Sequence, residues 1–241
     1  MCIRDSPYAA KRPPIDTHYF ETFNKDHVTL VDLQADPLAE IVQNGITLES
    51  GTHHELDVIV FATGYDAMTG PLLNLNIETA TASLKSYWEG GPRNYLGLAI
   101  PGFPNLFTIT GPGSPSVLSN MPVSIEQHVD WITECIAHCL ETGCTSIEAQ
   151  EQSAEIWTDH VRETADATLL PKVKHSWYLG ANIPGKPRVF MPYAGGLNIY
   201  RKICDNIAEE GYKGFDLISD KTQVISKPLD FKPLAGFMFG V

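Results

Sequence analysis

The sequence lacks any apolar run near the roughly 20 residues that a membrane-spanning helix needs, and its first residues hold no apolar segment of the signal-peptide kind. It is also short of cations, with 17 Lys and Arg against 29 Asp and Glu and a formal net charge of −12. Binding to nucleic acid needs clustered Lys and Arg. We therefore expect a cytoplasmic protein with no membrane partner and no nucleic-acid partner.

Cysteine is sparse and unpaired in pattern. The chain has 5 cysteines, an odd number, and none of them forms a CxxC pair. A disulfide framework is therefore not expected, and reduced thiols are the simplest interpretation. Cys135, His138 and Cys139 share one face of a predicted helix at a spacing that could hold a metal. With no second cluster in the sequence, packing in the core is the favoured interpretation, and we expect no metal.

What is present is an ordinary globular composition of 241 residues, with 43% hydrophobic residues, enough for one or two domains. Three apolar runs predict strands over residues 28–32, 56–62 and 106–110, and Asn44-Gly45 predicts a tight hairpin turn. The second and third runs are nearly continuous, which is typical of central parallel strands buried on both faces.

Helices are predicted over residues 123–142, 151–168 and 197–210. On the first, the spacing predicts an inward face, and on the second Trp157 leads a similar face. The predicted inward residues of the first helix are Ile125, Val129, Ile132, Ile136 and Cys139. Residues 174–188 have no periodicity and predict a long loop. Strands alternating with helices indicate an α/β fold class.

Four segments carry the chemistry. The first is Ala10-Lys11-Arg12-Pro13-Pro14, in which a stiff Pro-Pro follows two cations; alone, it is better interpreted as a solvated basic turn. The second is Phe61-Ala62-Thr63-Gly64-Tyr65-Asp66. A strand that ends in Thr63-Gly64 lets the backbone approach a ligand closely, because Gly has no Cβ. A plain strand-end turn is the alternative.

The third segment runs from Gly102 to Met121 and contains Gly111-Pro112-Gly113-Ser114-Pro115-Ser116. It is neither a GxGxxG fingerprint nor a GxSxG elbow, so a hydrolase with Ser114 or Ser116 as nucleophile is a weak alternative. The fourth is the loop Ser176–Arg188, with Trp177 near its start. Taken singly, Met121 and Trp177 are explained as well by core packing and by sealing of the surface.

Together and in this order, the four segments resemble Baeyer–Villiger monooxygenases of the cyclohexanone and phenylacetone type. The resemblance implies the C-terminal portion of an FAD- and NADPH-dependent enzyme that converts a ketone and O₂ to an ester or lactone through a C4a-peroxyflavin. It also implies an α/β fold, as an incomplete flavoprotein with two dinucleotide-binding domains.

The resemblance assigns roles residue by residue. Arg12 would be the catalytic cation, also close to the cofactors, because a guanidinium is always charged and can stabilise the peroxide and the adduct. Lys11 would pair with the NADP phosphate. Thr63 and Gly64 would contact a cofactor, Met121 the flavin ring, and Trp177 the NADP. Ser116, Val117 and Leu118 would line the ketone pocket.

The sequence departs from the family in what it lacks: neither glycine-rich dinucleotide fingerprint is present, nor is the FxGxxxHxxxW signature. We expect an unmatched leader over 1–7, the end of an NADP-binding domain over 8–60, the C-terminal part of an FAD-binding domain over 61–218 and a tail over 219–241. Alone, the chain is expected to fold poorly and to bind FAD weakly. An N-hydroxylating flavin monooxygenase fragment and a non-catalytic α/β binding module are the alternatives.

Overall fold

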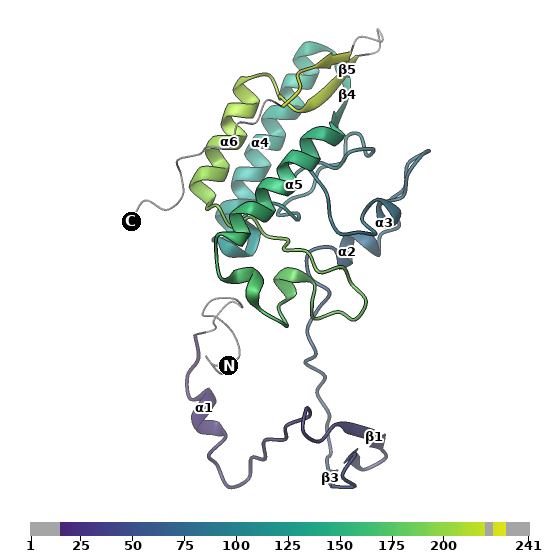
Figure 1. Cartoon of the computed structure of the whole chain (residues 1–241), viewed down its shortest axis with the longest axis vertical. Coiled ribbons are helices and arrows are strands. Elements are labelled where there is room, and N and C mark those ends of the chain that lie inside the picture. The colour runs from purple at the N-terminus through teal and green to yellow at the C-terminus, as the bar shows by residue number, and fades with distance from the viewer. Residues whose placement is uncertain (1–14, 220–223, 230–241) are drawn as a thin grey trace. The chain divides into compact units, whose positions relative to one another are not determined.

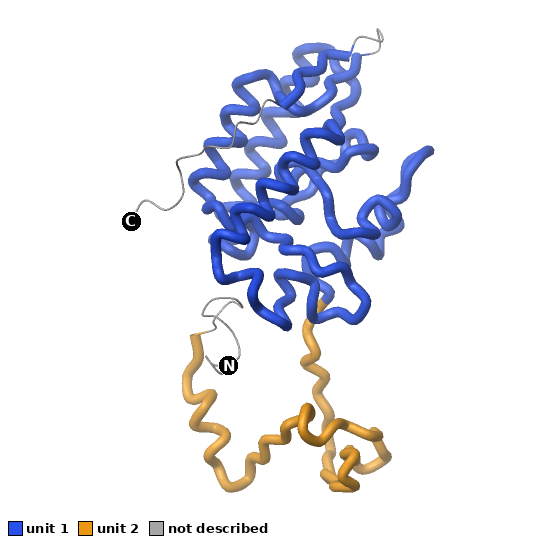
Figure 2. Tube along the Cα trace, in the orientation of Figure 1, with its two compact units in different colours: residues 1–11, 66–241 blue, residues 12–65 orange. Residues whose placement is uncertain are grey.

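The computed structural model describes residues 15–219 and 224–229, so Lys11 and Arg12 lie outside the described residues. The chain divides into two compact units. Unit 2 is formed by residues 12–65, and unit 1 by residues 66–241 together with 1–11 (Figure 2). The two units are thus formed by different parts of the sequence.

Unit 2 is a small antiparallel sheet preceded by a short helix. Helix α1 spans Tyr19–Thr22, and the strands are β1 (Leu38–Val42), β2 (Gly45–Leu48) and β3 (His53–Glu55), in the order β1-β2-β3 (Figure 1). Val42 pairs with Gly45, which confirms the hairpin turn predicted at Asn44-Gly45. Local turn chemistry alone decides this hairpin.

Two predicted strands of unit 2 are wrong. Residues 28–32 and 57–65 have no regular structure, and Val58 and Val60 are 75% and 82% exposed. No described strand pairs with the backbone of either run. A β-branched apolar run becomes a strand only when neighbouring strands and a packed face are available.

Unit 1 contains the remaining elements. Its helices are α2 (Gly70–Leu73), α3 (Leu84–Tyr87), η1 (Ser116–Leu118), α4 (Met121–Thr142), α5 (Glu151–Asp166), η2 (Leu170–Lys172), η3 (Trp177–Leu179) and α6 (Leu197–Glu209). Its strands are β4 (Cys144–Ala149), β5 (Phe215–Ser219) and β6 (Val224–Ser226). The three long helices are confirmed within about two residues at each end. Helix α4 ends at Gly143, whose φ of 70° is the left-handed conformation expected after a helix.

The core of unit 1 lies where α4, α5 and α6 pack with the antiparallel sheet β4-β5-β6 (Figure 1). Ile147 of β4 pairs with Leu217 of β5, and both side chains are buried. Trp157 of α5 and Tyr200 of α6 are fully enclosed in the same core. At about 25 cal/mol per Å² of apolar area, burial of these large side chains is the main source of stability.

The face that α4 buries differs from the predicted one. Ile125, Val129 and Ile136 are 38%, 43% and 46% exposed, so the prediction is wrong for these three residues, while Cys139 is buried as predicted. The side chains that the helix buries against the core are instead those of Ser124, Gln127, His128, Trp131 and Cys135. Trp131 fixes the orientation, because its indole N–H donates to the Cys204 carbonyl at 2.9 Å. Apolar residues on two faces left the periodicity ambiguous.

The strand predicted over residues 106–110 is also wrong. Phe107 forms only an isolated antiparallel bridge with Ala99, and the Thr108 N–H donates to the Leu98 carbonyl at 2.8 Å. Thr110 has a φ of 53°, which ends any extended run. The segment therefore pairs with a local turn instead of entering a parallel sheet.

Two features of the described part of the chain bear on membrane and metal binding. No helix there is long and apolar enough to cross a membrane. Nor do three or more His, Cys, Asp or Glu side chains converge there as a metal site. Burial raises the pKa of the Cys135 and Cys139 thiols, which keeps both protonated.

Candidate functional site

The loop from Gly111 to Ser116 is buried and held at several points. The Gly113 N–H donates to the Met191 carbonyl at 2.7 Å, and the Ser114 carbonyl accepts from the Tyr193 N–H at 2.7 Å. Gly113 has a φ of 85°, and a Cβ there would stand 2.7 Å from Oδ1 of Asn94. The loop therefore needs glycine at this position, both for its conformation and for its close packing.

Ser116 is the strained residue of this loop. Its φ of 36° is uncommon for a residue with a side chain, and it is fully buried. The hydroxyl of Ser119 donates to the Ser116 carbonyl at 2.8 Å and supports the turn of η1. Such strain persists only where the surroundings enforce it, and it is concentrated at functional sites.

The second element is the Trp177 loop, which we define as residues 176–188. Ser176 caps the turn η3 by accepting from the Tyr178 N–H at 3.2 Å, and Gly180 ends it with a φ of 67°. The loop then returns so that the Val189 and Met191 N–H groups donate to the Leu179 and Tyr178 carbonyls at 3.2 and 2.9 Å. The predicted aperiodic loop is confirmed, with one turn of helix at Trp177.

The fold brings the two elements together. Val117 and Leu118 of η1 and Trp177 of the Trp177 loop pack against one buried cluster, whose members are Ala165, Tyr178, Leu179 and Phe190. Residues that are about 60 positions apart in the sequence thus share one apolar centre. Trp177 is half-buried there, and its ring meets that of Tyr178 edge-on with 4.5 Å between centroids.

An ion pair joins the Trp177 loop to the segment after Thr63-Gly64. The ammonium of Lys186 donates to the carboxylate of Asp66, and it lies 3.5 Å from the Ala67 carbonyl oxygen. The Lys186 side chain is only 12% exposed. Next to Asp66, the sulfur of Met68 accepts from the Ser116 hydroxyl at 3.9 Å. Asp66, the last residue of the second segment, therefore lies in unit 1 together with parts of the third and fourth segments.

Sequence reasoning did not assign roles to Asp66, Met68 or Lys186. Asp66 ends the second segment, and Lys186 lies in the fourth. Their opposite charges were the one signal in the sequence that they could pair. Nothing in the sequence shows that residues 120 positions apart meet, so only the fold could pair them.

The other predicted site residues are placed as follows. Thr63 and Gly64 lie in unit 2 and are exposed, and Gly64 has a φ of 89° with no atom within 4 Å of the position of a Cβ. Met121 is half-buried at the first turn of α4. Lys11 and Arg12 belong to the residues that are not described.

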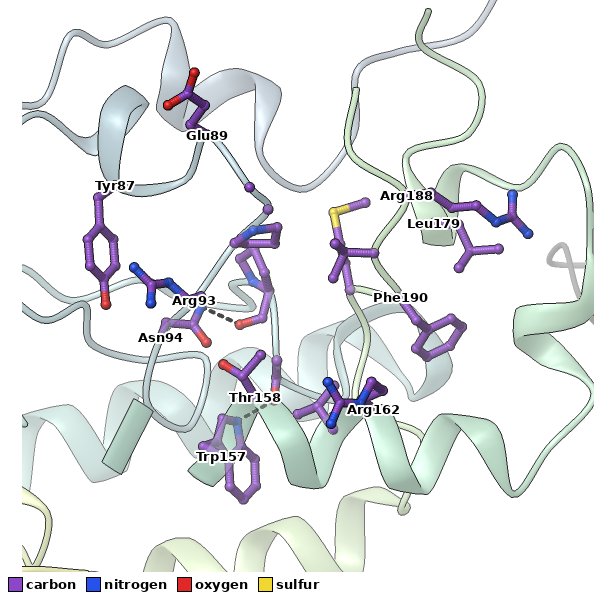
Figure 3. Close-up of a pocket in the computed structure, with 18 of the residues that line it drawn as sticks. Tyr87, Glu89, Arg93, Asn94, Trp157, Thr158, Arg162, Leu179, Arg188 and Phe190 are labelled. Atoms are coloured by element: carbon purple, nitrogen blue, oxygen red, sulfur yellow. Dashed lines mark hydrogen bonds between the residues drawn. The ribbon is translucent and has the colours of Figure 1, made fainter. Parts of the chain in front are cut away.

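A pocket of about 640 Å³ opens between α5 and the segments 86–94 and 188–191, with Pro112 and Gly113 in its wall (Figure 3). Asn94 donates to the Pro112 carbonyl at its wall, and the Trp157 indole N–H donates to the Gly113 carbonyl at 3.0 Å. None of the site residues predicted from the sequence lines it.

The arginines of this pocket already have partners. Arg93 lies 3.3 Å from a carboxylate oxygen of Glu151 and stacks over the Tyr87 ring at 4.6 Å. Arg188 donates to the carbonyls of Pro171, Val173 and Lys174. Arg162 pairs with Asp159 at 2.9 Å. Arg93 and Arg162 thus each pair with a carboxylate, and Arg188 is held by three backbone carbonyls.

The geometry does not support a hydrolase. The Ser114 hydroxyl donates to the Gly111 carbonyl at 2.7 Å, and the Ser116 hydroxyl points to the Met68 sulfur. Both serines are fully buried. A serine nucleophile needs a histidine within hydrogen-bond reach and access to substrate, and neither condition is met here.

Comparison with known proteins gives clear relatives, although no family model matches the chain. The chain is 40% identical over 216 residues to cyclohexanone 1,2-monooxygenase of Acinetobacter, with 89% of this chain and 39% of the relative covered. It is 44% identical over 214 residues to a Baeyer–Villiger monooxygenase of Pseudooceanicola batsensis, covering 88% and 38%. A phenazine N-monooxygenase of Lysobacter antibioticus is 39% identical over 218 residues, covering 90% and 40%.

Solved structures agree. An oxidized steroid monooxygenase bound to NADP superimposes with a TM-score of 0.80 at 47% identity, covering 89% of this chain and 40% of the other. The OTEMO complex with FAD and NADP gives 0.83 at 35% identity, covering 89% and 39%. These matches confirm the fold class, that of an incomplete two-domain flavoprotein. The chain spans about two-fifths of the length of these relatives, and the matches confirm its resemblance to the C-terminal portion of Baeyer–Villiger monooxygenases.

Proposed function

We propose that the chain forms part of an FAD- and NADPH-dependent monooxygenase that converts a ketone and O₂ to an ester or a lactone. The observation that carries the proposal is the packing of Val117 and Leu118 with the Trp177 loop in one cluster. Two segments that the resemblance assigns to substrate and to NADP thus share one side of the fold. The identity of 40–44% to ketone monooxygenases over nearly nine-tenths of the chain supports it.

The described residues fit these cofactors only in part. The exposed Thr63-Gly64 backbone leaves open space for a close approach, and the strained turn at Ser116 offers a preformed wall. No glycine-rich fingerprint for a pyrophosphate occurs among the 241 residues. The chain therefore supplies contacts for the flavin edge and the nicotinamide. The pyrophosphate groups need the glycine-rich fingerprints, which are not among these residues.

Bound NADPH would supply the reducing equivalents, and the reduced flavin would activate O₂. The chain's own residues would bind and orient these groups. Met121 would contact the flavin ring, Trp177 would contact the NADP, and Ser116, Val117 and Leu118 would line the ketone pocket. Lys11 would neutralise a nucleotide phosphate. Arg12 would stabilise the negative charge that develops on oxygen, because a guanidinium stays charged and offers a rigid set of donors.

The domain boundaries at residues 7/8, 60/61 and 218/219 and a cytoplasmic location belong to the same proposal. One relative favours a second candidate, since a phenazine N-monooxygenase is 39% identical to the chain. Oxygenation at an aromatic ring nitrogen would use the same cofactors and a differently shaped pocket. Both substrate classes therefore belong in the assay.

The test uses this chain joined to the preceding sequence of the Acinetobacter cyclohexanone 1,2-monooxygenase, so that both dinucleotide fingerprints are present. We expect NADPH- and O₂-dependent ester or lactone formation from ketones. Changing Arg12 to Ala should lower product formation by about 10²–10³-fold, the typical loss for one oxyanion donor, while NADPH still reduces the flavin. Arg12→Lys keeps the positive charge but loses the planar guanidinium. Its product formation should lie between that of the original protein and that of Arg12→Ala.

Normal ester formation by the Arg12→Ala enzyme would contradict the assigned role. Product from a phenazine and none from ketones would favour the N-oxygenating alternative. The chain alone is expected to bind FAD weakly, and a stoichiometric flavin absorbance spectrum of the purified 241-residue chain would contradict that expectation. If the joined protein folds, holds FAD and oxidises neither substrate class, the proposed function is wrong.

A further inference from the structure

The contact between Lys186 and Asp66 lies between two functional segments. Lys186 stands near the tip of the Trp177 loop, and Asp66 follows Thr63-Gly64 by two residues. The pair joins the loop tip to the segment 66–68 through side chains. Since the Lys186 side chain is 12% exposed, the charge is largely removed from water and depends on its partner.

The surroundings leave room for this pair at both ends. A Cβ added at Gly70 would stand 2.6 Å from the carboxyl carbon of Asp66, so only glycine admits that carboxylate. At the other end, a Cβ at Gly180 would stand 3.1 Å from Cδ of Lys186, and Gly180 also has a φ of 67°. Two glycines thus accommodate the pair, one beside each side chain.

The base of the Trp177 loop is held independently of Lys186. Backbone hydrogen bonds join Leu179 to Val189 and Tyr178 to Met191, and Arg188 donates to carbonyls of the η2 segment. The tip between them has backbone turn bonds, among them those from the Ile183 N–H to the Gly180 carbonyl and from the Lys186 N–H to the Ile183 carbonyl, and the Ala181 N–H donates to the Ser176 carbonyl at 3.2 Å. The Lys186 side chain adds the ion pair that joins this tip to Asp66.

We propose that the Lys186–Asp66 pair is a latch that holds the Trp177 loop in its folded position, which makes Lys186 and Asp66 positioning residues for NADP binding. The inference rests on the proposed function, because it takes from it that this loop covers NADP. When only a fraction of molecules has the loop folded, the apparent dissociation constant of the ligand rises by the inverse of that fraction. The latch raises this fraction.

If Lys186 had another role, neutralising Asp66 would change NADP affinity in the opposite direction. If its ammonium bound an NADP phosphate directly, Asp66 would compete for it, and neutralising Asp66 would tighten NADP binding. In the latch, neutralising either partner releases the tip, so Asp66→Asn and Lys186→Met weaken NADP binding alike. The double variant then weakens it no further than either single change, because the pair acts as one unit.

The first measurement is hydrogen exchange of residues 176–188 in the 241-residue chain. We expect exchange to be about tenfold faster in Lys186→Met and in Asp66→Asn, with Lys186→Arg close to the original chain. Lys174→Met is the matched control, an exposed cation next to the loop, and should change nothing. Unchanged exchange in both single variants, with the original chain protected, would overturn the latch.

The second measurement is the dissociation constant of NADP⁺ in the joined protein, followed by flavin absorbance. Both single variants should raise it by about tenfold, with equal effect in the double variant and recovery in Lys186→Arg. Tighter binding by Asp66→Asn would overturn the latch in favour of direct phosphate contact. If exchange responds as expected and no variant oxidises a substrate, the proposed function fails while the latch stands.

Discussion

Units 1 and 2 differ in how much of their apolar surface they enclose. Unit 1 surrounds a continuous core, with Trp157, Tyr200 and Phe215 each 1% exposed or less. In the described part of unit 2, Leu48 is the only buried hydrophobic side chain. Yet unit 2 carries runs as apolar as any in unit 1. Hydrophobic sequence therefore produces structure only where the chain supplies a second surface to pack against.

The largest expected effect is in the core of unit 1. Trp157→Ala removes a side chain that is 1% exposed, stacks on Tyr193 with 5.3 Å between ring centroids, and donates to Gly113. We expect the free energy of unfolding to fall by about 3–5 kcal/mol, the usual loss for a buried tryptophan. Urea unfolding of the full chain measures this change in free energy. A loss below about 1 kcal/mol would mean that the core of unit 1 contributes no more stability than the exposed runs of unit 2.

The second effect depends on pH. His128 is fully buried, its Nδ1 accepts from the Thr110 N–H at 2.9 Å, and burial lowers its pKa from 6.5 to about 4. Between these values the unfolded chain binds a proton that the folded chain does not, so stability is lost as pH falls from about 6.5 to 4. Burial also lowers the pKa of His160, which adds to the same trend.

His128→Asn keeps an acceptor for the Thr110 N–H and does not titrate in this range. We expect its midpoint of urea unfolding to depend less steeply on pH between 4 and 6.5 than that of the original chain. Equal slopes for the two proteins would show that other groups, such as His160, account for the acid sensitivity.

The third effect compares the two faces of α4. Cys135→Ser places a hydroxyl at a fully buried position and should lower the free energy of unfolding by about 1–3 kcal/mol. Ile136→Ser, one residue along and 46% exposed, should cost less than about 1 kcal/mol. Urea unfolding of both variants gives the order directly. A larger loss for Ile136→Ser would mean that the predicted apolar face is the packed one.

The smallest effect is expected in unit 2. Val60 is 82% exposed in a segment without regular structure, so Val60→Ala should change the free energy of unfolding by less than about 0.5 kcal/mol. The urea midpoint of this variant should coincide with that of the original chain. A loss near that of Trp157→Ala would show that the run from Leu56 to Ala62 packs after all.

Local chemistry was sufficient to predict part of the molecule. The hairpin at Asn44-Gly45, the end of α4 at Gly143, and the extents of α5 and α6 follow from turn residues, caps and helical period, all of which act within a few positions. The roles that the resemblance gives to Ser116, Val117, Leu118 and Trp177 stay predictions.

The failures share one cause. Whether residues 56–62 or 106–110 form strands depends on partners far away in the chain, and no periodicity reports on those. The buried face of α4 was decided by the contact of Trp131 with Cys204, on another helix. A helix with apolar residues on two sides cannot show in its own sequence which side meets the core.

The sequence by itself determined the family resemblance, the long helices and the identity of the candidate residues, because these depend on residue type, order and short-range spacing. Only the tertiary structure decided that Trp177 meets Val117 and Leu118, that Lys186 reaches Asp66, and that Gly70 and Gly180 leave room for that pair. Contacts between residues about 60 to 120 positions apart depend on how whole elements pack, which is a property of the folded chain.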